Sequence, residues 1–193
     1  GSVVNGPYSQ TFYDGLGRVI RVVTQGFDGT ATGGATTAKL IYQDTEYNAR
    51  GLASRKSRPY FADAITTYWT EYTYDTLGRL VQEKSPDGNI SKVEYAGLVT
   101  KSTNAKNQTR TETKNLIGQL VTVSDALNNN LVRNYDELGN LVKTTDALGN
   151  VITLEYDLKG RKTKMVDPDM GTWTYVYNSI GELVQQTDAK AQT

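Results

Sequence analysis

The sequence contains neither cysteine nor histidine among its 193 residues. The missing cysteine excludes disulfide bonds and thiolate chemistry, and it leaves the redox compartment open. Together the two absences remove the commonest general base, the commonest partner of a catalytic nucleophile and the usual ligands of transition metals. An enzyme is therefore not expected, and we assign no catalytic residue, no cofactor and no metal site.

Net charge and long apolar runs are also missing. The 21 basic and 21 acidic residues balance to zero, whereas nucleic acids and anionic membranes require a basic surface on the protein. No apolar run is long enough to cross a bilayer, and no targeting signal is recognisable. We expect neither a nucleic-acid partner nor a membrane span.

The sequence has few residues for a core of its own, because 37% are hydrophobic and 9% aromatic. The charged fraction of 22% is balanced in sign, however, which is unlike the composition of disordered chains. We therefore expect a folded chain with little interior.

A short phrase is written twice within residues 134–157. The first copy runs from Asp136 to Asn140 with the sequence DELGN, and the second runs from Asp146 to Asn150 with the sequence DALGN. Asp can accept a hydrogen bond from the backbone two residues on, and Gly adopts positive φ at no steric cost, so D-x-L-G predicts a tight turn. Residues 151–156 then alternate in the manner of a half-buried strand.

The turn glycine recurs every 21 residues, and a tyrosine stands four residues before it in most copies. Both regularities extend over the chain with shortened or lengthened spacings, and Lys114 replaces the tyrosine in one copy. The repeats begin at Tyr13, Tyr47, Tyr74, Tyr95, Lys114, Tyr135, Tyr156 and Tyr177.

Two spacings exceed the period. Tyr13 and Tyr47 are 34 residues apart, and Tyr47 and Tyr74 are 27 apart. We expect loop insertions near residues 28–38, which are rich in small residues, and near residues 58–67, which are more aromatic.

A fixed period near 20 residues is typical of architectures in which each unit packs against its neighbours. Two turns per period predict two antiparallel strands per unit, each roughly six residues long. The expected fold class is all-β, a repetitive antiparallel hairpin meander in which residues 1–193 form a single array of about eight repeats.

The motif itself is specific. Tyr-Asp-x-Leu-Gly-Arg/Asn, followed by Leu-Val and then by Asp-x-x-Gly-Asn, resembles the YD repeat of the RHS family. That family includes bacterial Rhs polymorphic toxins, the B and C components of insecticidal toxin complexes, and the teneurins.

The resemblance implies a curved, spiralling sheet that is one segment of a shell, and thus a fragment of a much larger protein. In the bacterial members the shell encloses a C-terminal toxin, so the implied partner is a cargo toxin polypeptide of the same or a partner chain. The implied location is secreted or at the bacterial cell surface. The function expected is a non-catalytic structural segment of that shell.

The alternative function is a carbohydrate-binding or receptor-binding module. Tyrosines of successive repeats should stack along one sheet face, either as a platform for glycans or as a packing ladder that fixes strand register. Aromatic residues beside the second insertion could also take part in recognition. The possible ligand-facing residues are Tyr135, Tyr156, Tyr177, Tyr68, Trp69 and Tyr72.

Charged residues of the turns have simpler interpretations. Asp14, Asp75, Asp136 and Asp157 follow repeat tyrosines and could ligate calcium, but capping of the turn explains them at less cost. Arg18, Arg79 and Arg161 follow the turn glycine and are expected to pair with carboxylates across a strand. The stretch Asp167–Gly171, DPDMG, resembles part of the D-P-x-G-L signature linked to autoproteolysis in shell-forming relatives, but it lacks the Leu, so an enlarged turn is expected.

The last repeat stops near its second turn, at a strand that has no successor in the sequence. Exposed strand edges invite pairing with other chains. We expect edge-to-edge association of the isolated chain.

Overall fold

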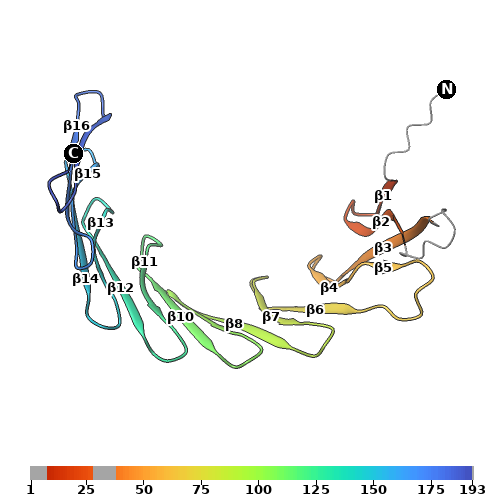
Figure 1. Ribbon diagram of the computed structural model, residues 1–193. Coiled ribbons are helices and arrows are strands. Elements are labelled where there is room, and N and C mark those ends of the chain that lie inside the picture. Colours follow the sequence, from red (N-terminus) through yellow and green to blue (C-terminus); the bar gives the residue numbers. More distant parts are fainter. Residues whose placement is uncertain (1–7, 28–37, 193) are drawn as a thin grey trace, which may run out of the picture. The chain divides into compact units, whose positions relative to one another are not determined.

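The computed structural model describes residues 8–27 and 38–192, and these residues form strands and turns without a helix, so none that could cross a membrane (Figure 1). The chain divides into two compact units, residues 1–93 and 94–193. Each unit is built from antiparallel strands, which confirms the predicted all-β hairpin meander. Of the insertion predicted near residues 28–38, residues 28–37 lie outside the described part.

The first unit begins with a short strand, which two long strands and then several shorter ones follow. Strands β1, β2 and β3 pair in chain order, β3 then pairs with both β4 and β5, and β4 pairs with β6, which leads through β7 to β8. The strands are β1 (Ser9–Tyr13), β2 (Val19–Phe27), β3 (Ala38–Tyr47), β4 (Ala53–Ser57), β5 (Tyr60–Phe61), β6 (Trp69–Tyr74), β7 (Leu80–Lys84) and β8 (Ile90–Ala96).

The insertion predicted near residues 58–67 contains the short strand β5. This strand pairs with the first half of β3, where Tyr60 lies opposite Tyr42. The two rings meet edge to face with centroids 5.8 Å apart, an arrangement that the ring quadrupoles favour. The inserted residues therefore extend the sheet beside β4 before the chain returns to the repeat at β6.

The second unit is a regular meander. Consecutive strands from β9 to β17 pair with one another in chain order. The strands are β9 (Val99–Thr103), β10 (Thr109–Lys114), β11 (Leu120–Ser124), β12 (Asn130–Tyr135), β13 (Leu141–Thr145), β14 (Val151–Tyr156), β15 (Lys162–Asp167), β16 (Gly171–Tyr177) and β17 (Leu183–Thr187).

The repeated five-residue phrase folds as predicted, as a tight hairpin turn. The backbone N–H of Asp136 donates to the carbonyl of Asn140 at 2.9 Å, and that of Gly139 donates to the carbonyl of Asp136 at 3.1 Å. Gly139 has φ of 87°, the left-handed conformation that ends a three-residue hairpin loop. Asn128 occupies the equivalent position with φ of 63°, since Asn tolerates this conformation.

Every hairpin closed by a Tyr-Asp turn also contains a β-bulge. Tyr135 pairs with Leu141, but Asn134 pairs with Lys143, so Val142 has no opposite residue. The same shift follows Tyr156 and Tyr177. Sequence analysis did not predict the bulge, although two successive apolar residues after the turn interrupt the alternation of a strand and are its signal.

The turn at Asp167 is tighter than expected. Asp167 pairs directly with Gly171, so three residues close this hairpin, and the backbone N–H groups of Asp169 and Met170 donate to the Asp167 carboxylate at 2.8 and 2.9 Å. The enlarged turn predicted here is therefore wrong. Proline at the first loop position presets φ for a tight turn.

The sheet has almost no interior. Among the described residues Val23 is the one buried apolar side chain, at 4% exposure, and Ser57 is the one buried polar side chain. The chain exposes 13388 Å², whereas a compact monomer of its mass would expose about 9,100 Å². Neighbouring strands, rather than a second layer, therefore hold the structure together.

The left-handed turn glycines should be sensitive to a side chain for conformational reasons alone. A Cβ at Gly149 would meet no atom within 4 Å, but φ there is 86°. We expect Gly149→Ala to lower the free energy of unfolding in urea by about 1 to 2 kcal/mol, and Gly149→Asn to lower it less. Gly15→Ala is the matched control, because its surroundings are equally open and its φ is ordinary; an equal loss in both alanine variants would contradict this account.

Candidate functional site

Tyrosine hydroxyls join neighbouring repeats. The hydroxyl groups of Tyr135, Tyr156 and Tyr177 each donate to a backbone carbonyl of the preceding repeat at 3.0 Å. Tyr47 and Tyr74 make the same bond in the first unit, at 2.8 and 2.9 Å. All five rings are half-buried. One side of each ring is therefore committed to the sheet.

The acceptor carbonyl lies at a defined place in each hairpin. Tyr156 donates to Leu141, the residue that pairs with Tyr135 and precedes the bulge at Val142. A slip of one residue would lose this bond and would move the side chains of the strand to the other face. The geometry favours the packing-ladder interpretation, while the ligand-facing role of these tyrosines stays a prediction.

The three aromatic candidates beside the insertion do not form one cluster. Tyr68 precedes β6 and is 57% exposed, whereas Trp69 and Tyr72 lie in β6 at positions of opposite parity and so on opposite faces. Burial raises the pKa of Tyr72, and nearby Glu83 adds to that effect. Trp69 alone of the predicted set lines the groove described below.

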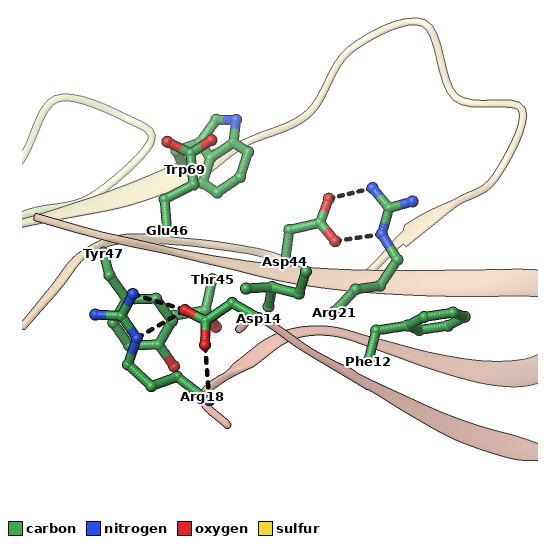
Figure 2. A pocket seen from close by; sticks show the side chains of 10 residues that line it. Phe12, Asp14, Arg18, Arg21, Asp44, Thr45, Glu46, Tyr47 and Trp69 are labelled. Carbon is green, nitrogen blue, oxygen red and sulfur yellow. Dashed lines mark hydrogen bonds and ion pairs between the residues drawn. The ribbon is translucent and has the colours of Figure 1, made fainter. Parts of the chain in front are cut away.

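The first unit carries a groove of about 580 Å³ on the side of the sheet where β1, β2, β3 and β6 begin or end. Aromatic rings and charged side chains alternate around it, as Figure 2 shows. Its lining includes Phe12, Tyr47, Trp69, Asp14, Arg18, Arg21, Asp44 and Glu46.

A three-residue cluster fixes one end of the groove. Arg21 forms two parallel bonds with the carboxylate of Asp44, at 2.6 and 2.8 Å, and the Tyr60 hydroxyl donates to the same carboxylate at 2.5 Å. The hydrogen bond from Arg21 is the main cause of the lowered pKa of Asp44. The same bond raises the pKa of Arg21. Burial, and then the bond to Asp44, raise the pKa of Tyr60.

Arginines also lie over aromatic rings of the groove. Arg18 is 4.4 Å from the centre of the Tyr47 ring. Arg55 is 4.3 Å from the centre of the Trp69 ring and pairs with Glu46 through bonds of 2.7 and 2.8 Å. Two bonds to one carboxylate fix the plane of a guanidinium group. The groove is consequently preformed, with its charges paired among themselves.

This arrangement suits recognition better than chemistry. The three carboxylates that line the groove, Asp14, Asp44 and Glu46, are each paired with an arginine. Flat rings beside paired polar groups can instead stack against a ligand and bond its hydroxyl groups. Apart from Trp69, sequence analysis missed these residues, because partners from β1, β2 and β3 are brought together only by strand pairing.

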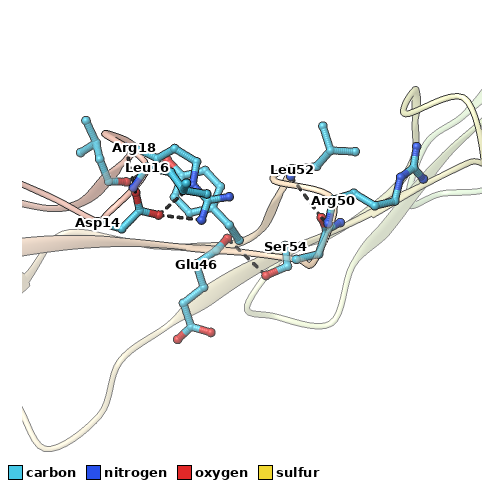
Figure 3. Close-up of polar contacts among 10 residues, drawn as sticks. Asp14, Leu16, Arg18, Glu46, Arg50, Leu52 and Ser54 are labelled. Carbon is cyan, nitrogen blue, oxygen red and sulfur yellow. Dashed lines mark hydrogen bonds and ion pairs between the residues drawn. The ribbon is translucent and has the colours of Figure 1, made fainter.

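Carboxylates of the turns are engaged within their own turns. Oδ1 of Asp14 accepts the backbone N–H groups of Leu16 and Arg18 at 2.9 and 3.0 Å, and Oδ2 accepts Nε of Arg18 at 2.7 Å (Figure 3). Asp75 with Arg79, and Asp157 with Arg161, repeat this pattern. The prediction that these arginines pair across a strand is wrong, since the carboxylate four residues earlier is nearer. The contacts support the capping interpretation of the aspartates.

Similarity to known proteins can now be set beside this geometry. Residues 135–169 match the family model described as RHS Repeat. Residues 135–169 carry the RHS repeat. The matched segment runs from Tyr135 through the turns at Asp146 and Asp157, and it contains both partners of the bond from Tyr156 to the Leu141 carbonyl. No curated protein sequence matches the chain significantly.

Solved structures share the fold. A crystal structure of TcdB2-TccC3-Cdc42 superposes with a TM-score of 0.71 at 16% identity, covering 94% of this chain and 11% of that chain. A Photorhabdus luminescens Tc holotoxin pore with a mutated TccC3 gives 0.56 at 16% identity, covering 95% of this chain and 12% of that chain. The RHS-repeat chain thus spans about an eighth or less of the length of these polypeptides.

The turn carboxylates predict a stability that falls in acid. Hydrogen bonds, chiefly from Asn150, lower the pKa of Asp146, and the same cause lowers those of Asp125 and Asp136. A folded-state pKa below the unfolded value stabilises the fold at neutral pH, and this contribution is lost as the pH falls below about 4. The urea midpoint should therefore drop between about pH 7 and about pH 3.

Substitution at one turn tests the cause. Asp146→Asn keeps the acceptor oxygen, as Asn115 does at its own turn, but removes the ionisation, so its urea midpoint should change less with pH than that of the parent. Asn115→Asp is the reverse change and should increase the acid sensitivity. Identical pH profiles for the parent and both variants would show that these carboxylates are not responsible.

Proposed function

We propose that the chain is a non-catalytic wall segment of an RHS shell that encloses a polypeptide cargo, a toxin or effector, in a secreted bacterial protein. The observation that carries the proposal is the single-layered repeat sheet, in which Val23 is the one buried apolar side chain of the described residues. A sheet without its own core can separate two compartments, since both of its faces remain available for contact with other molecules.

Physical properties of the meander support this role. The strands satisfy their backbone hydrogen bonds within the sheet, so the wall can be lengthened by adding repeats that contact only their neighbours. The fold is shared over 94% of the chain with a structure of TcdB2-TccC3-Cdc42, whose polypeptide is far longer. Enclosure needs no reactive side chain, in agreement with a sequence that has neither histidine nor cysteine.

The two sheet faces allow a direct test, because the chain has no cysteine of its own. Thr174 is exposed on one face, and Gln186, which lies opposite Tyr175, is exposed on the other. Thr174→Cys and Gln186→Cys would be placed singly in the complete protein that contains this chain, with any cysteine elsewhere replaced. A bulky maleimide reagent should label one position and leave the other protected until the protein is unfolded.

The isolated chain is the control, in which both cysteines should react at similar rates. Equal labelling of the two positions in the complete folded protein would contradict enclosure, because a wall separates an inner from an outer face.

A second candidate function is the binding of a glycan or a surface receptor. The groove around Trp69 favours it, because stacked rings and paired charges form a rigid polar pocket of about 580 Å³. The tyrosines of the repeats, including Tyr135, Tyr156 and Tyr177, remain candidates for the same role through their exposed ring faces.

Glycan-array screening followed by calorimetry separates the two candidates. If the groove binds a glycan, Trp69→Ala should abolish saturable binding while circular dichroism stays unchanged. Leu158→Ala, at a residue that is 97% exposed and lies in the second unit, is the matched control and should bind as the parent does. A parent that binds no glycan would remove the second candidate and leave the wall.

A further inference from the structure

Apolar side chains form two rows along the second unit. Successive turns of a meander lie at opposite ends of its strands, so the turns that follow the tyrosine position form one rim, here called the YD rim, and the other turns form the opposite rim. The apolar side chains of the YD rim are Leu116, Ile117, Leu138, Leu158 and Ile180, and those of the opposite rim are Leu127, Leu148 and Met170.

These side chains are far more exposed than the sheet requires. Leu138 is 72% exposed, Ile117 75%, Leu127 81% and Leu148 88%. The turns themselves are made by the capping Asp or Asn and by the left-handed residue, and central turn positions favour polar or small residues. Single exposed leucines are ordinary, but a row repeated from turn to turn is typical of a contact surface.

Hydrogen bonds join two pairs of neighbouring turns on the YD rim. The side-chain amide of Gln119 donates to the carbonyl of Gly139 at 2.9 Å, and Arg161 donates to the carbonyl of Asn178 at 3.3 Å, so each bond ties one turn to the next. Arg161 also lies 4.8 Å from the centre of the Tyr177 ring. A preorganised surface loses little conformational entropy when a partner binds.

A notch separates two neighbouring turns of the YD rim. This groove of about 590 Å³ lies between the turns at 115–118 and 136–139, with Leu116, Ile117 and Glu137 among its lining residues. Turns on one rim recur every second strand, roughly 10 Å apart. The notch therefore lies between side chains that recur along the rim.

The opposite rim has the complementary relief. In its turns a small residue stands beside a large apolar one, as Ala126 beside Leu127 and Ala147 beside Leu148. Each such turn presents one large apolar side chain. These side chains recur with the same two-strand spacing as the turns of the YD rim. Two YD rims would instead oppose turns such as Leu116-Ile117, which carry two large side chains and no small one.

We propose that the YD rim of the second unit docks on the opposite rim of a second copy of this chain, with leucines of one rim seated between the turns of the other. The two surfaces in contact are different, so the interface is heterologous, and each copy retains one free rim for a further copy. This contact differs from pairing of exposed edge strands, because it uses turn side chains rather than backbone hydrogen bonds.

Two rim variants and a mixture test the proposal. The YD-rim variant carries Ile117→Glu and Leu138→Glu, and the opposite-rim variant carries Leu127→Glu and Leu148→Glu. All four side chains are at least 72% exposed, so circular dichroism should report an unchanged fold. The control variant, Thr153→Glu with Thr172→Glu, adds the same charge on an exposed strand face.

Sedimentation velocity over a range of concentrations gives the readout. The parent and the control should self-associate equally, and each rim variant alone should do so about tenfold more weakly or not at all, as expected when apolar anchors of an interface are lost. An equimolar mixture of the two rim variants should form a dimer, since each retains the rim that the other lacks.

Three other outcomes would overturn the proposal. A parent that stays monomeric at every concentration would show that the rims do not dock. Rim variants that associate as strongly as the parent would assign the association to the strand edges. If the YD-rim variant were monomeric while the opposite-rim variant, measured separately, still dimerised, the contact would lie between two YD rims.

Discussion

The capped turn is the interaction on which the rest of this structure depends. A sheet of one layer gains little from apolar burial, so each hairpin must be closed by its own local contacts. At Asp136 the carboxylate accepts the backbone N–H groups of Leu138 and Asn140, and Gly139 supplies the left-handed residue that completes the loop. Because hairpins at both ends of the strands repeat this closure, at Asp125 and Asp146 as well, strand length and strand direction are fixed turn by turn.

Register between hairpins needs a second device, which the bulge and the tyrosine supply together. Val142 is left without an opposite residue, and the carbonyl of Leu141 beside it accepts the Tyr156 hydroxyl from the next repeat. Each tyrosine can therefore make its hydrogen bond only when the preceding hairpin is in the correct register. In other folds, packing in the core disfavours a strand that has slipped in register. This sheet has almost no core, so a hydrogen bond that forms in only one register takes over that role.

The sequence predicted those structural features that depend on residues close together in the chain. The turns and the strand at 151–156 are local, and the structure has them where the sequence places them. The groove was missed because Phe12 and Glu46 meet only through strand pairing. Arg18 was assigned to a partner across a strand because side-chain reach within a turn is not visible in the spacing of residues.

Because a few residues of each turn fix its conformation, the remaining side chains on the rims are free to vary. Within a YD turn the Asp, the Gly and the preceding Tyr are each fixed by a bond or a backbone angle, while the turn uses only the backbone, and not the side chains, of the two central positions. Leu138 occupies such a position, whereas Lys159 stands at the equivalent position of the next repeat. Selection can therefore change the rim without disturbing the wall, so specificity for a partner is more readily built into the turns than into the strands.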